Sequence, residues 1–307
     1  INDTLKVWDN GEKLILNMPV SLEPLQSFQQ NISISNGESI GKITLAGSIM
    51  NLNDSADKVL DRPLEPYKNF DWNTAYGFYL KGNYDAGTRH YKKAENNIRL
   101  SLSKEPAFIP SLDEMTFLQY RKMNYDSAYY FALTALSVNT YDPMANYYYG
   151  LSALKLNKIY DAEDGFEVAA IEPQYRSAAY TELSKIKLQQ KNYQLSFEYA
   201  VKSLVNNSEN ITSLQLEYVC ARLMNNKIEQ EKIKATILHL DPMNHFMRFE
   251  DYWQNKNAVN KQLFTFLIRD ELPQQTYLNL AIWYSNLGLN EESQAVLEAC
   301  PQKDDEI

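Results

Sequence analysis

Apolar and polar positions alternate in the first fifty residues of the chain. In "TLKVWDNGEKLILNM" (residues 4–18) the alternation continues on both sides of Asp9-Asn10-Gly11, a turn sequence typical of a β-hairpin. In "QSFQQNISISNGESIGKITLAGSI" (residues 26–49) a second pair of alternating runs flanks Ser35-Asn36-Gly37. We therefore expect four strands and a small antiparallel β-sheet segment in residues 1–50.

The hydrophobic pattern changes at about residue 70. Residues 51–71 contain Pro63 and Pro66 and follow no clear period, so we interpret them as a linker. From Trp72 onward glycine nearly disappears and apolar positions follow the helical period. The remainder of the chain is therefore expected to be α-helical.

Four kinds of position recur at every 34th residue of this helical part. Three of these columns hold small residues and the fourth holds bulky ones. They are Gly77, Ser111, Ala145, Ala179 and Ser213; Ala94, Ala128, Ala162 and Ser196; Ser101, Ala135, Ala169 and Ser203; and the bulky Tyr91, Tyr125, Ile159 and Tyr193. Small residues let two helices approach closely, and pairs of helices that cannot bury their own apolar faces must stack.

This register resembles the tetratricopeptide repeat (TPR), a helix-turn-helix unit of 34 residues. Gly82 and Gly150 fall at its small eighth position, and Pro106 and Pro242 at its thirty-second. The resemblance places unit starts at Ala75, Ile109, Pro143, Ser177 and Ile211. A further unit, with Ala281, Tyr284, Gly288 and Ser293, follows one irregular helical pair at about 245–273. The resemblance implies a mainly α chain. In it residues 72–301 form a TPR-type α-solenoid, which is a right-handed superhelix of helical hairpins, and residues 302–307 form a tail.

In the TPR family the first helix of each unit lines a concave groove that binds peptides. Carried over to this sequence, the groove positions are Tyr76, Tyr79, Asn83, Asp113, Phe117, Tyr120, Tyr147 and Leu151. In the run Tyr147-Tyr148-Tyr149, successive residues point about 100° apart. We expect Tyr149 to pack inside its hairpin, Tyr148 to face the neighbouring unit, and Tyr147 alone to face the groove. The alternative is that neighbouring helices or the N-terminal sheet cover these positions.

Charge and motifs narrow the range of functions. The net charge of -9 argues against nucleic-acid binding, and no apolar run is long enough to span a membrane. Phosphate-loop, dinucleotide, nucleophile-elbow and metal-ligand motifs are missing, so we expect no catalytic residues, no cofactor and no metal. The basic residues with which some TPR proteins hold acidic C-termini are also missing, because Tyr79 and Asn83 are followed by Asp113 and Glu114.

The order of parts carries a second, looser resemblance. A β segment, the linker motif "RPLEPYKNF" and a TPR array are similar to the C-terminal region of large bacterial proteins with a galactose-mutarotase-type β-sandwich. This resemblance implies that residues 1–50 end a longer β domain and that the N-terminus is truncated. The compartment, bacterial cytoplasm or periplasm, stays open.

Two functions are compatible with these observations. The first is a non-enzymatic scaffold that binds a peptide, a protein partner or another domain of its own parent chain in the aromatic groove. The second is carbohydrate binding or processing, in which tyrosines stack on sugar faces while Asp113 and Asn83 bind hydroxyls.

Overall fold

A computed structural model describes residues 2–21, 28–33, 40–45, 48–50, 70–266, 268 and 272–301. The chain forms two compact units, Ile1–Phe70 and Asp71–Ile307, which we describe separately. Most of the predicted linker, at 51–69, and the predicted tail at 302–307 lie outside the described residues.

The N-terminal unit contains an antiparallel sheet with strand order β2-β1-β3-β4. Its strands are β1 (Asn2–Asp9), β2 (Leu14–Ser21), β3 (Ile40–Leu45) and β4 (Ser48–Met50). The predicted hairpin at Asp9-Asn10-Gly11 joins β1 and β2. The Asp9 carboxylate stabilises this turn because it accepts the backbone N–H groups of Gly11 and Lys13 at 2.8 and 2.9 Å.

The second predicted hairpin is wrong in its pairing. Residues 28–33 are not a strand, and the expected turn at Ser35-Asn36-Gly37 lies outside the described residues. Instead β3 pairs with β1, so that Val7 lies opposite Ile43, and β4 adds to the far edge. Alternation in sequence identifies a strand but does not choose its neighbour, which here is the strand with the buried Val7.

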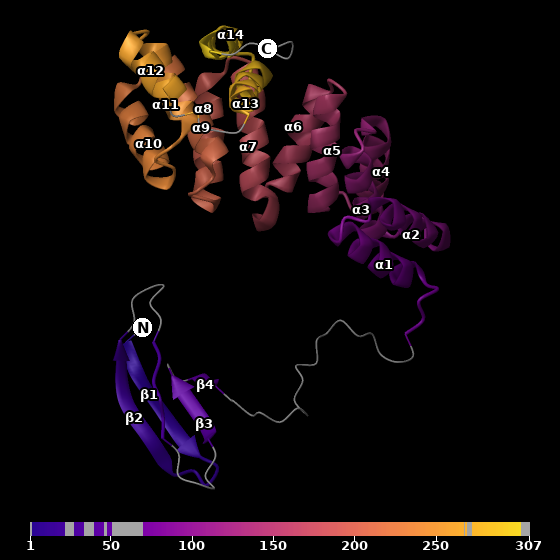
Figure 1. Cartoon of the computed structure of the whole chain (residues 1–307). Helices are drawn as coiled ribbons and strands as arrows, with labels where there is room; N and C mark the ends of the chain where they lie inside the picture. Colours follow the sequence, from indigo (N-terminus) through magenta and orange to yellow (C-terminus); the bar gives the residue numbers. More distant parts are fainter. Residues whose placement is uncertain are drawn as a thin grey trace. The chain divides into compact units, whose positions relative to one another are not determined.

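The second unit consists of helices packed in consecutive antiparallel pairs (Figure 1). They are α1 (Ala75–Gly87), α2 (Tyr91–Lys104), α3 (Ile109–Arg121), α4 (Tyr125–Val138), α5 (Pro143–Lys155), α6 (Ile159–Ala169), α7 (Pro173–Gln189), α8 (Tyr193–Asn206), α9 (Ile211–Leu223), α10 (Lys227–Leu240), α11 (His245–Gln254), α12 (Ala258–Phe266), α13 (Pro273–Asn286) and α14 (Asn290–Ala299). Four of the five predicted repeat starts coincide with the first residue of a helix. The exception is the fourth, where α7 begins at Pro173 instead of Ser177. No helix in the described part of the chain has the length and apolar character needed to cross a membrane.

Small residues hold the helices of each pair in close contact. The three predicted small columns are buried throughout. A Cβ atom added to Gly82 would lie 2.6 Å from the Ile98 side chain, and one added to Gly150 would lie 2.8 Å from the Phe166 ring. These distances are too short for any side chain larger than hydrogen. In the small columns serine also fits, because its hydroxyl reaches a backbone carbonyl, as Ser101 does with Ala75 at 2.7 Å.

The turn inside each repeat uses a left-handed residue that is seldom glycine. Positive φ values recur every 34 residues, at Arg89, Met123, Asn157, Lys191 and Asn225, and lie between 58° and 63°. The following residue returns its N–H group to the first helix, for example from Asn124 to the Gln119 carbonyl at 3.0 Å. This geometry is a Schellman-type helix end, in which glycine is the residue usually favoured.

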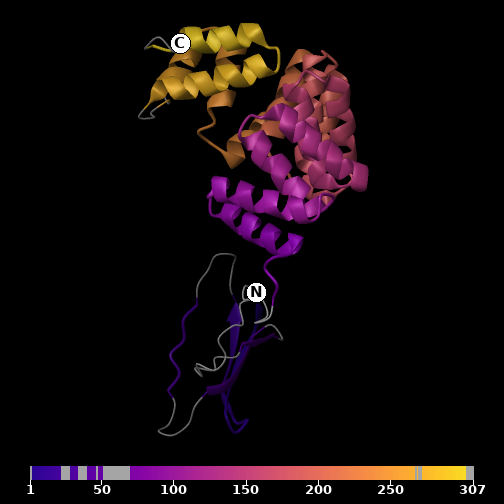
Figure 2. The ribbon, with the colours of Figure 1, turned by 90° about the vertical axis from the view of Figure 1, so that its right-hand side faces the viewer.

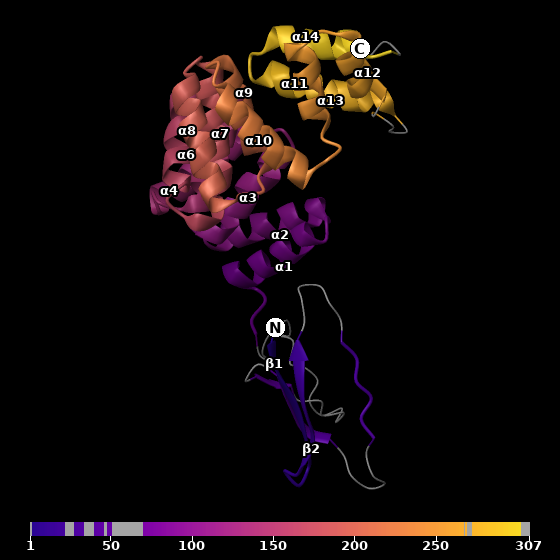
Figure 3. The ribbon, with the colours of Figure 1, turned by 90° about the vertical axis from the view of Figure 1, so that its left-hand side faces the viewer.

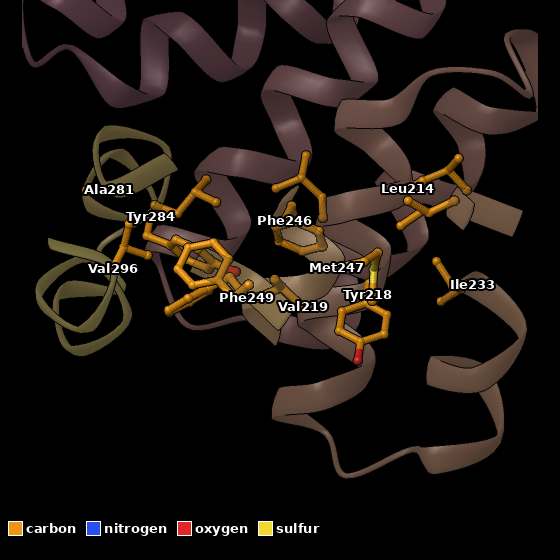
Figure 4. Packing of buried hydrophobic residues seen from close by; sticks show 14 of the residues in the cluster. Leu214, Tyr218, Val219, Ile233, Phe246, Met247, Phe249, Ala281, Tyr284 and Val296 are labelled. Atoms are coloured by element: carbon orange, nitrogen blue, oxygen red, sulfur yellow. The ribbon is translucent and has the colours of Figure 1, made fainter. Parts of the chain in front are cut away.

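The irregular pair α11–α12 and the last hairpin, α13–α14, close the C-terminal end of the array beside α9 and α10 (Figures 2 and 3). Aromatic and aliphatic side chains from α9, α11, α13 and α14 form one buried cluster (Figure 4). Within it Arg222 of α9 forms ion pairs with Glu250 of α11 at 2.9 Å and Glu292 of α14 at 2.7 Å. Tyr284 of α13 donates its hydroxyl to Glu250 at 2.7 Å. One arginine thus connects three helices that no regular repeat would bring together.

Replacement of Met123 by glycine should stabilise the protein. Met123 adopts a φ of 62° and is 74% exposed, so the change relieves a left-handed backbone and removes little packing. We expect a gain of about 0.5–1 kcal/mol in the free energy of unfolding, measured by urea denaturation. Asn157→Gly is the matched control and should gain less, because asparagine tolerates this conformation. Equal gains at the two positions would contradict the explanation.

Removal of Arg222 should destabilise the helical unit strongly. Arg222→Ala leaves Glu250, which is fully buried, and Glu292 without their cation, at an expected cost of about 3–5 kcal/mol. Lys232→Ala is the control, because Lys232 forms only an exposed pair with Glu229 and should cost less than about 1 kcal/mol. The free energy of unfolding of both variants is measured by denaturation. Similar decreases in the two would show that the buried ion pairs of Arg222 do not stabilise the helical unit more than an exposed pair does.

Candidate functional site

Aromatic side chains follow one another along the first helices of the repeats. At the N-terminal end, Tyr76 and Tyr79 of α1 stack with ring centroids 6.3 Å apart, and both rings contact Phe108 at the start of α3. The helices α1, α3, α5 and α7 are parallel neighbours, so these rings are the first of a strip of aromatic side chains along them. We call the surface formed by these four helices the first-helix face.

The strip continues through the triple-tyrosine run of α5. Tyr148 contacts Phe117 and Tyr120 of the preceding repeat, as its helical position predicts. The distances between ring centroids are 5.8 and 5.7 Å. Tyr147 packs against Phe166 of its own hairpin and against Tyr175 of α7, with ring centroids 5.7 and 5.4 Å apart. Tyr147 is therefore half-buried between two repeats, and the expectation that it alone of the three faces the groove stays a prediction.

The eight predicted groove residues differ in exposure. Tyr76 and Asn83 are exposed, Asp113 is buried, and the other five are half-buried: Tyr79, Phe117, Tyr120, Tyr147 and Leu151. The aromatic residues thus pack partly on one another. This self-packing limits the surface that a partner can contact to ring edges and to the exposed face of Tyr76.

Carboxylates gather at the α1 end of the first-helix face. Asp113 is 8% exposed, and its Oδ1 atom is buried with no hydrogen-bond donor among the described residues. Burial, together with the neighbouring carboxylates of Asp142 and Glu114, raises the pKa of Asp113 to about 8. Burial also raises the pKa of Glu114, although a hydrogen bond from Asn83 opposes the change. Asp113 therefore keeps its proton at neutral pH.

Asp142 owes its place beside Asp113 to its role as a helix cap. It precedes Pro143, and its carboxylate accepts the backbone N–H of Ala145 at 2.9 Å, which fixes the start of α5. Burial is the main cause that raises the pKa of Tyr175, and the charges of Asp113 and Asp142 raise it further. Burial likewise raises the pKa of Tyr79, and the charges of Glu114 and Asp113 add to the effect. Asp113 is thus electrostatically coupled to two further carboxylates and to two tyrosines.

A pocket of about 420 Å³ lies at the other end of the strip, where α13 crosses the first helices. Its wall includes Tyr120 and Leu151 from the predicted set, and Trp283 from α13. The Gln189 amide of α7 donates to the Asn286 carbonyl at 2.5 Å, which ties α13 to the array. The indole N–H of Trp283 is buried without an acceptor among the described residues. The pocket therefore has a mixed wall, in which Leu151 and Trp283 alternate with polar side chains such as Lys155 and Glu182.

Sequence reasoning missed part of this arrangement. Tyr175 and Glu114 lie outside the groove positions transferred from the family, and Trp283 belongs to a hairpin about 100 residues away from α7. The sequence indicates Asp142 only as a helix cap, because this residue directly precedes Pro143. The clustering of Asp113, Glu114 and Asp142 could have been found from the repeat register, because Asp142 begins the unit that follows the other two.

Among the described residues there is no group of three or more His, Cys, Asp or Glu side chains placed to hold a metal ion. Both cysteines, Cys220 and Cys300, are buried and free. Arg222 of α9 stands at a position that the TPR resemblance assigns to the concave side of the fifth unit. It lies instead in the buried ion cluster under α11 and α14. The C-terminal helices cover that part of the array.

No protein-family model matches the sequence, and no curated protein sequence matches it. The fold, however, is similar to solved TPR structures. PilF of Pseudomonas aeruginosa superposes with a TM-score of 0.56 at 15% identity, covering 72% of this chain and 96% of PilF. A TPR protein of Parabacteroides merdae gives a TM-score of 0.52 at 16% identity, covering 73% of this chain and 98% of its own.

The helical unit has a TPR-like fold. YrrB, described as a TPR protein with an unusual peptide-binding site, is also similar, with a TM-score of 0.50 at 11% identity, over 58% of this chain and 91% of YrrB. Identities this low establish the fold of the TPR unit and nothing about its ligand. The resemblance of residues 1–50 to the end of a galactose-mutarotase-type β-sandwich stays a prediction.

Replacement of Asp113 by asparagine should change how stability depends on pH. Because the folded pKa of about 8 lies above the usual value of 3.8, wild-type stability is greatest when Asp113 is protonated and falls as pH rises from about 4 to about 8. An asparagine at this position would not titrate, and its amide can donate to Asp142. We expect the free energy of unfolding of Asp113→Asn, relative to wild type, to increase by about 1–3 kcal/mol from pH 5 to pH 8, measured by urea denaturation. A difference between the two proteins that does not change with pH would contradict this assignment.

Proposed function

We propose that the chain is a non-catalytic interaction scaffold, and that its first-helix face is a concave groove for an extended segment of a partner polypeptide. The partner is a separate protein or another domain of the parent chain. The TPR-like fold supports this function, because TPR proteins form the structural neighbours and one of them, YrrB, is described as having a peptide-binding site.

One observation carries the proposal: aromatic side chains on the first-helix face lead into a pocket. Tyr148 contacts Phe117 and Tyr120, and Tyr120 is also part of the pocket wall, while a second ring group with the exposed Tyr76 lies on α1. An extended peptide advances by about 3.3 Å per residue, so its alternate side chains can lie on successive rings. Tyrosine provides large contact area at low conformational cost, which is why it is enriched at binding hot spots.

The pocket provides directional contacts at the end of the strip. Lys155 and Asn157 line the pocket as exposed donors. Lys185 is already held by Glu182 at 2.7 Å, which leaves the pocket a net positive charge on Lys155. These groups suit the carbonyl oxygens of a peptide backbone, because hydrogen bonds from a charged donor are stronger than neutral ones.

A carbohydrate ligand is the alternative, since tyrosine rings also stack on sugars. Asn83 and Asp113 would bind hydroxyl groups in that case, but Asn83 is bonded to Glu114 and Asp113 is buried. Their positions favour the polypeptide. A glycan array with the full chain tests the alternative directly, and a specific glycan response that Tyr76→Ala removes would replace the peptide proposal.

Truncation of Tyr76 should weaken peptide binding without disturbing the fold. We would select peptides from a display library on the full chain and measure their affinity by anisotropy, with Trp283 fluorescence as a second signal. Tyr76 is 50% exposed, so Tyr76→Ala should lower affinity about 5- to 30-fold, or about 1–2 kcal/mol, and leave stability nearly unchanged.

The matched control is Tyr160→Ala. Tyr160 lies on the second helix of its repeat and is 84% exposed, so the same truncation occurs away from the first-helix face. It should leave affinity unchanged. If no peptide is selected, or if both variants lose affinity equally, the groove is not the binding site.

A further inference from the structure

The pocket between α5, α7 and α13 is a cavity that a side chain of a partner can enter. Its volume is about 420 Å³, which is within the usual range of about 300–1,000 Å³ for ligand pockets. Leu151 and Lys155 line it from α5, Glu182 and Lys185 from α7, and Trp283 from α13. Because α13 belongs to the last hairpin and not to a regular repeat, the TPR register alone does not build this pocket.

Lys155 brings a positive charge to this pocket that no group of the chain neutralises. Two neighbouring lysines already have partners: Lys185 pairs with the Glu182 carboxylate at 2.7 Å, and the Lys158 ammonium lies 3.7 Å from the ring centroid of Tyr129. Lys155 is exposed, and within the described residues it takes part in no ion pair and no cation–π contact. Its charge is therefore available to a group from outside.

The position of Lys155 in its helix explains only part of this arrangement. Lys155 stands in the last turn of α5, where the helix dipole favours a cation. Lys104 stands in the same place at the end of α2, and it is also exposed and without an ion pair among the described residues. However, α2 is the second helix of its repeat, away from the first-helix face. The pocket beside Lys155 is thus what distinguishes the two lysines.

Apolar surface lies next to this charge. Leu151 and Trp283 are half-buried, so that part of each side chain is open to the pocket. The Trp283 ring is fixed by its neighbours, because its centroid lies 5.1 Å from that of Phe246 and 4.9 Å from that of Tyr284. A ring that is already ordered loses little freedom when a partner packs against it. The pocket can therefore accept an apolar side chain beside Lys155.

We propose that this pocket is a receptor for an acidic residue, aspartate or glutamate, that stands next to a bulky apolar residue in the partner polypeptide. The carboxylate pairs with Lys155, and the apolar side chain packs against Leu151 and Trp283. This inference rests on the proposed function and names the chemistry of its partner. Lys155 is not one of the groove positions that the TPR resemblance assigns, and its ligand is a side chain within the partner instead of a chain end.

The charge of the whole chain makes this preference easy to recognise. The net charge of -9 attracts basic partners over long distances. A preference for an acidic residue at one position of a bound peptide therefore has to come from a local cation. Because the pair with Lys155 forms at an exposed ammonium, added salt should weaken it.

The test selects nine-residue internal segments from a display library on the full chain. We expect aspartate or glutamate to be enriched beside leucine, isoleucine or an aromatic residue. One selected peptide is then synthesised with an acetylated N-terminus and an amidated C-terminus, with glutamate, glutamine or lysine at the acidic position. By anisotropy in 50 mM NaCl, the glutamate peptide should bind about 5- to 10-fold tighter than the glutamine peptide, and the lysine peptide should bind weakest. This difference should shrink in 500 mM NaCl.

Charge reversal of Lys155 should reverse the preference. Lys155→Glu should bind the lysine peptide tighter than the glutamate peptide, and Lys155→Gln should bind the glutamate and glutamine peptides equally. Lys104→Glu is the matched control, because it makes the same change at the end of another helix. It should keep the wild-type preference. Urea denaturation of all three variants shows whether each is folded under the binding conditions.

Three results would overturn the assignment of Lys155. The first is a preference for glutamate that persists in Lys155→Glu, which would give the role to another cation such as Lys185. The second is loss of the preference in Lys104→Glu, which would show an effect of total charge. The third is binding that requires a free C-terminal carboxylate, which would make the ligand a chain end.

Failure of this inference differs from failure of the proposed function. If the glutamate and glutamine peptides bind equally well to the wild-type chain and Tyr76→Ala weakens both, then the groove stands and the acidic receptor falls. If library selection gives no binder, both proposals fall.

Discussion

The close approach of the two helices in each repeat is the constraint from which the rest of the helical unit follows. Where Gly150 meets the Phe166 ring, even one methyl group has no space, and three columns of small residues repeat this contact along the chain. The two helices of each regular repeat can therefore approach closely. Repetition of this hairpin makes α1, α3, α5 and α7 successive neighbours, and this row brings tyrosines of separate repeats into contact.

The repeat architecture could be predicted from the sequence because it depends on residue size at a fixed period. Alanine, glycine and serine at 34-residue intervals leave one packing solution, and α3 and α5 begin at the predicted Ile109 and Pro143. The N-terminal strands show the limit of such reasoning. Alternation identifies β1 and β3, but their pairing depends on long-range packing of Val7, which no local pattern contains.

The candidate site was predictable only in outline. The register places Tyr76 and Tyr120 on first helices, but the raised pKa of Asp113 depends on its burial and on Asp142, which stands at the start of the next repeat. Likewise Arg222 seemed a groove residue until Glu250 and Glu292 approached it from helices outside the regular repeat. Effects that need three or more elements to meet have no signature in a single helix.

The contact between Gln189 and Asn286 has a consequence for how the array loses its structure. In an open solenoid each repeat touches only its neighbours, so terminal repeats can fray while the middle persists. Here a hydrogen bond joins residues 97 positions apart, and α13 rests on α7 rather than only on the hairpin before it. The last hairpin cannot detach without exposing the middle of the array, so the C-terminal half should melt as one cooperative block rather than repeat by repeat.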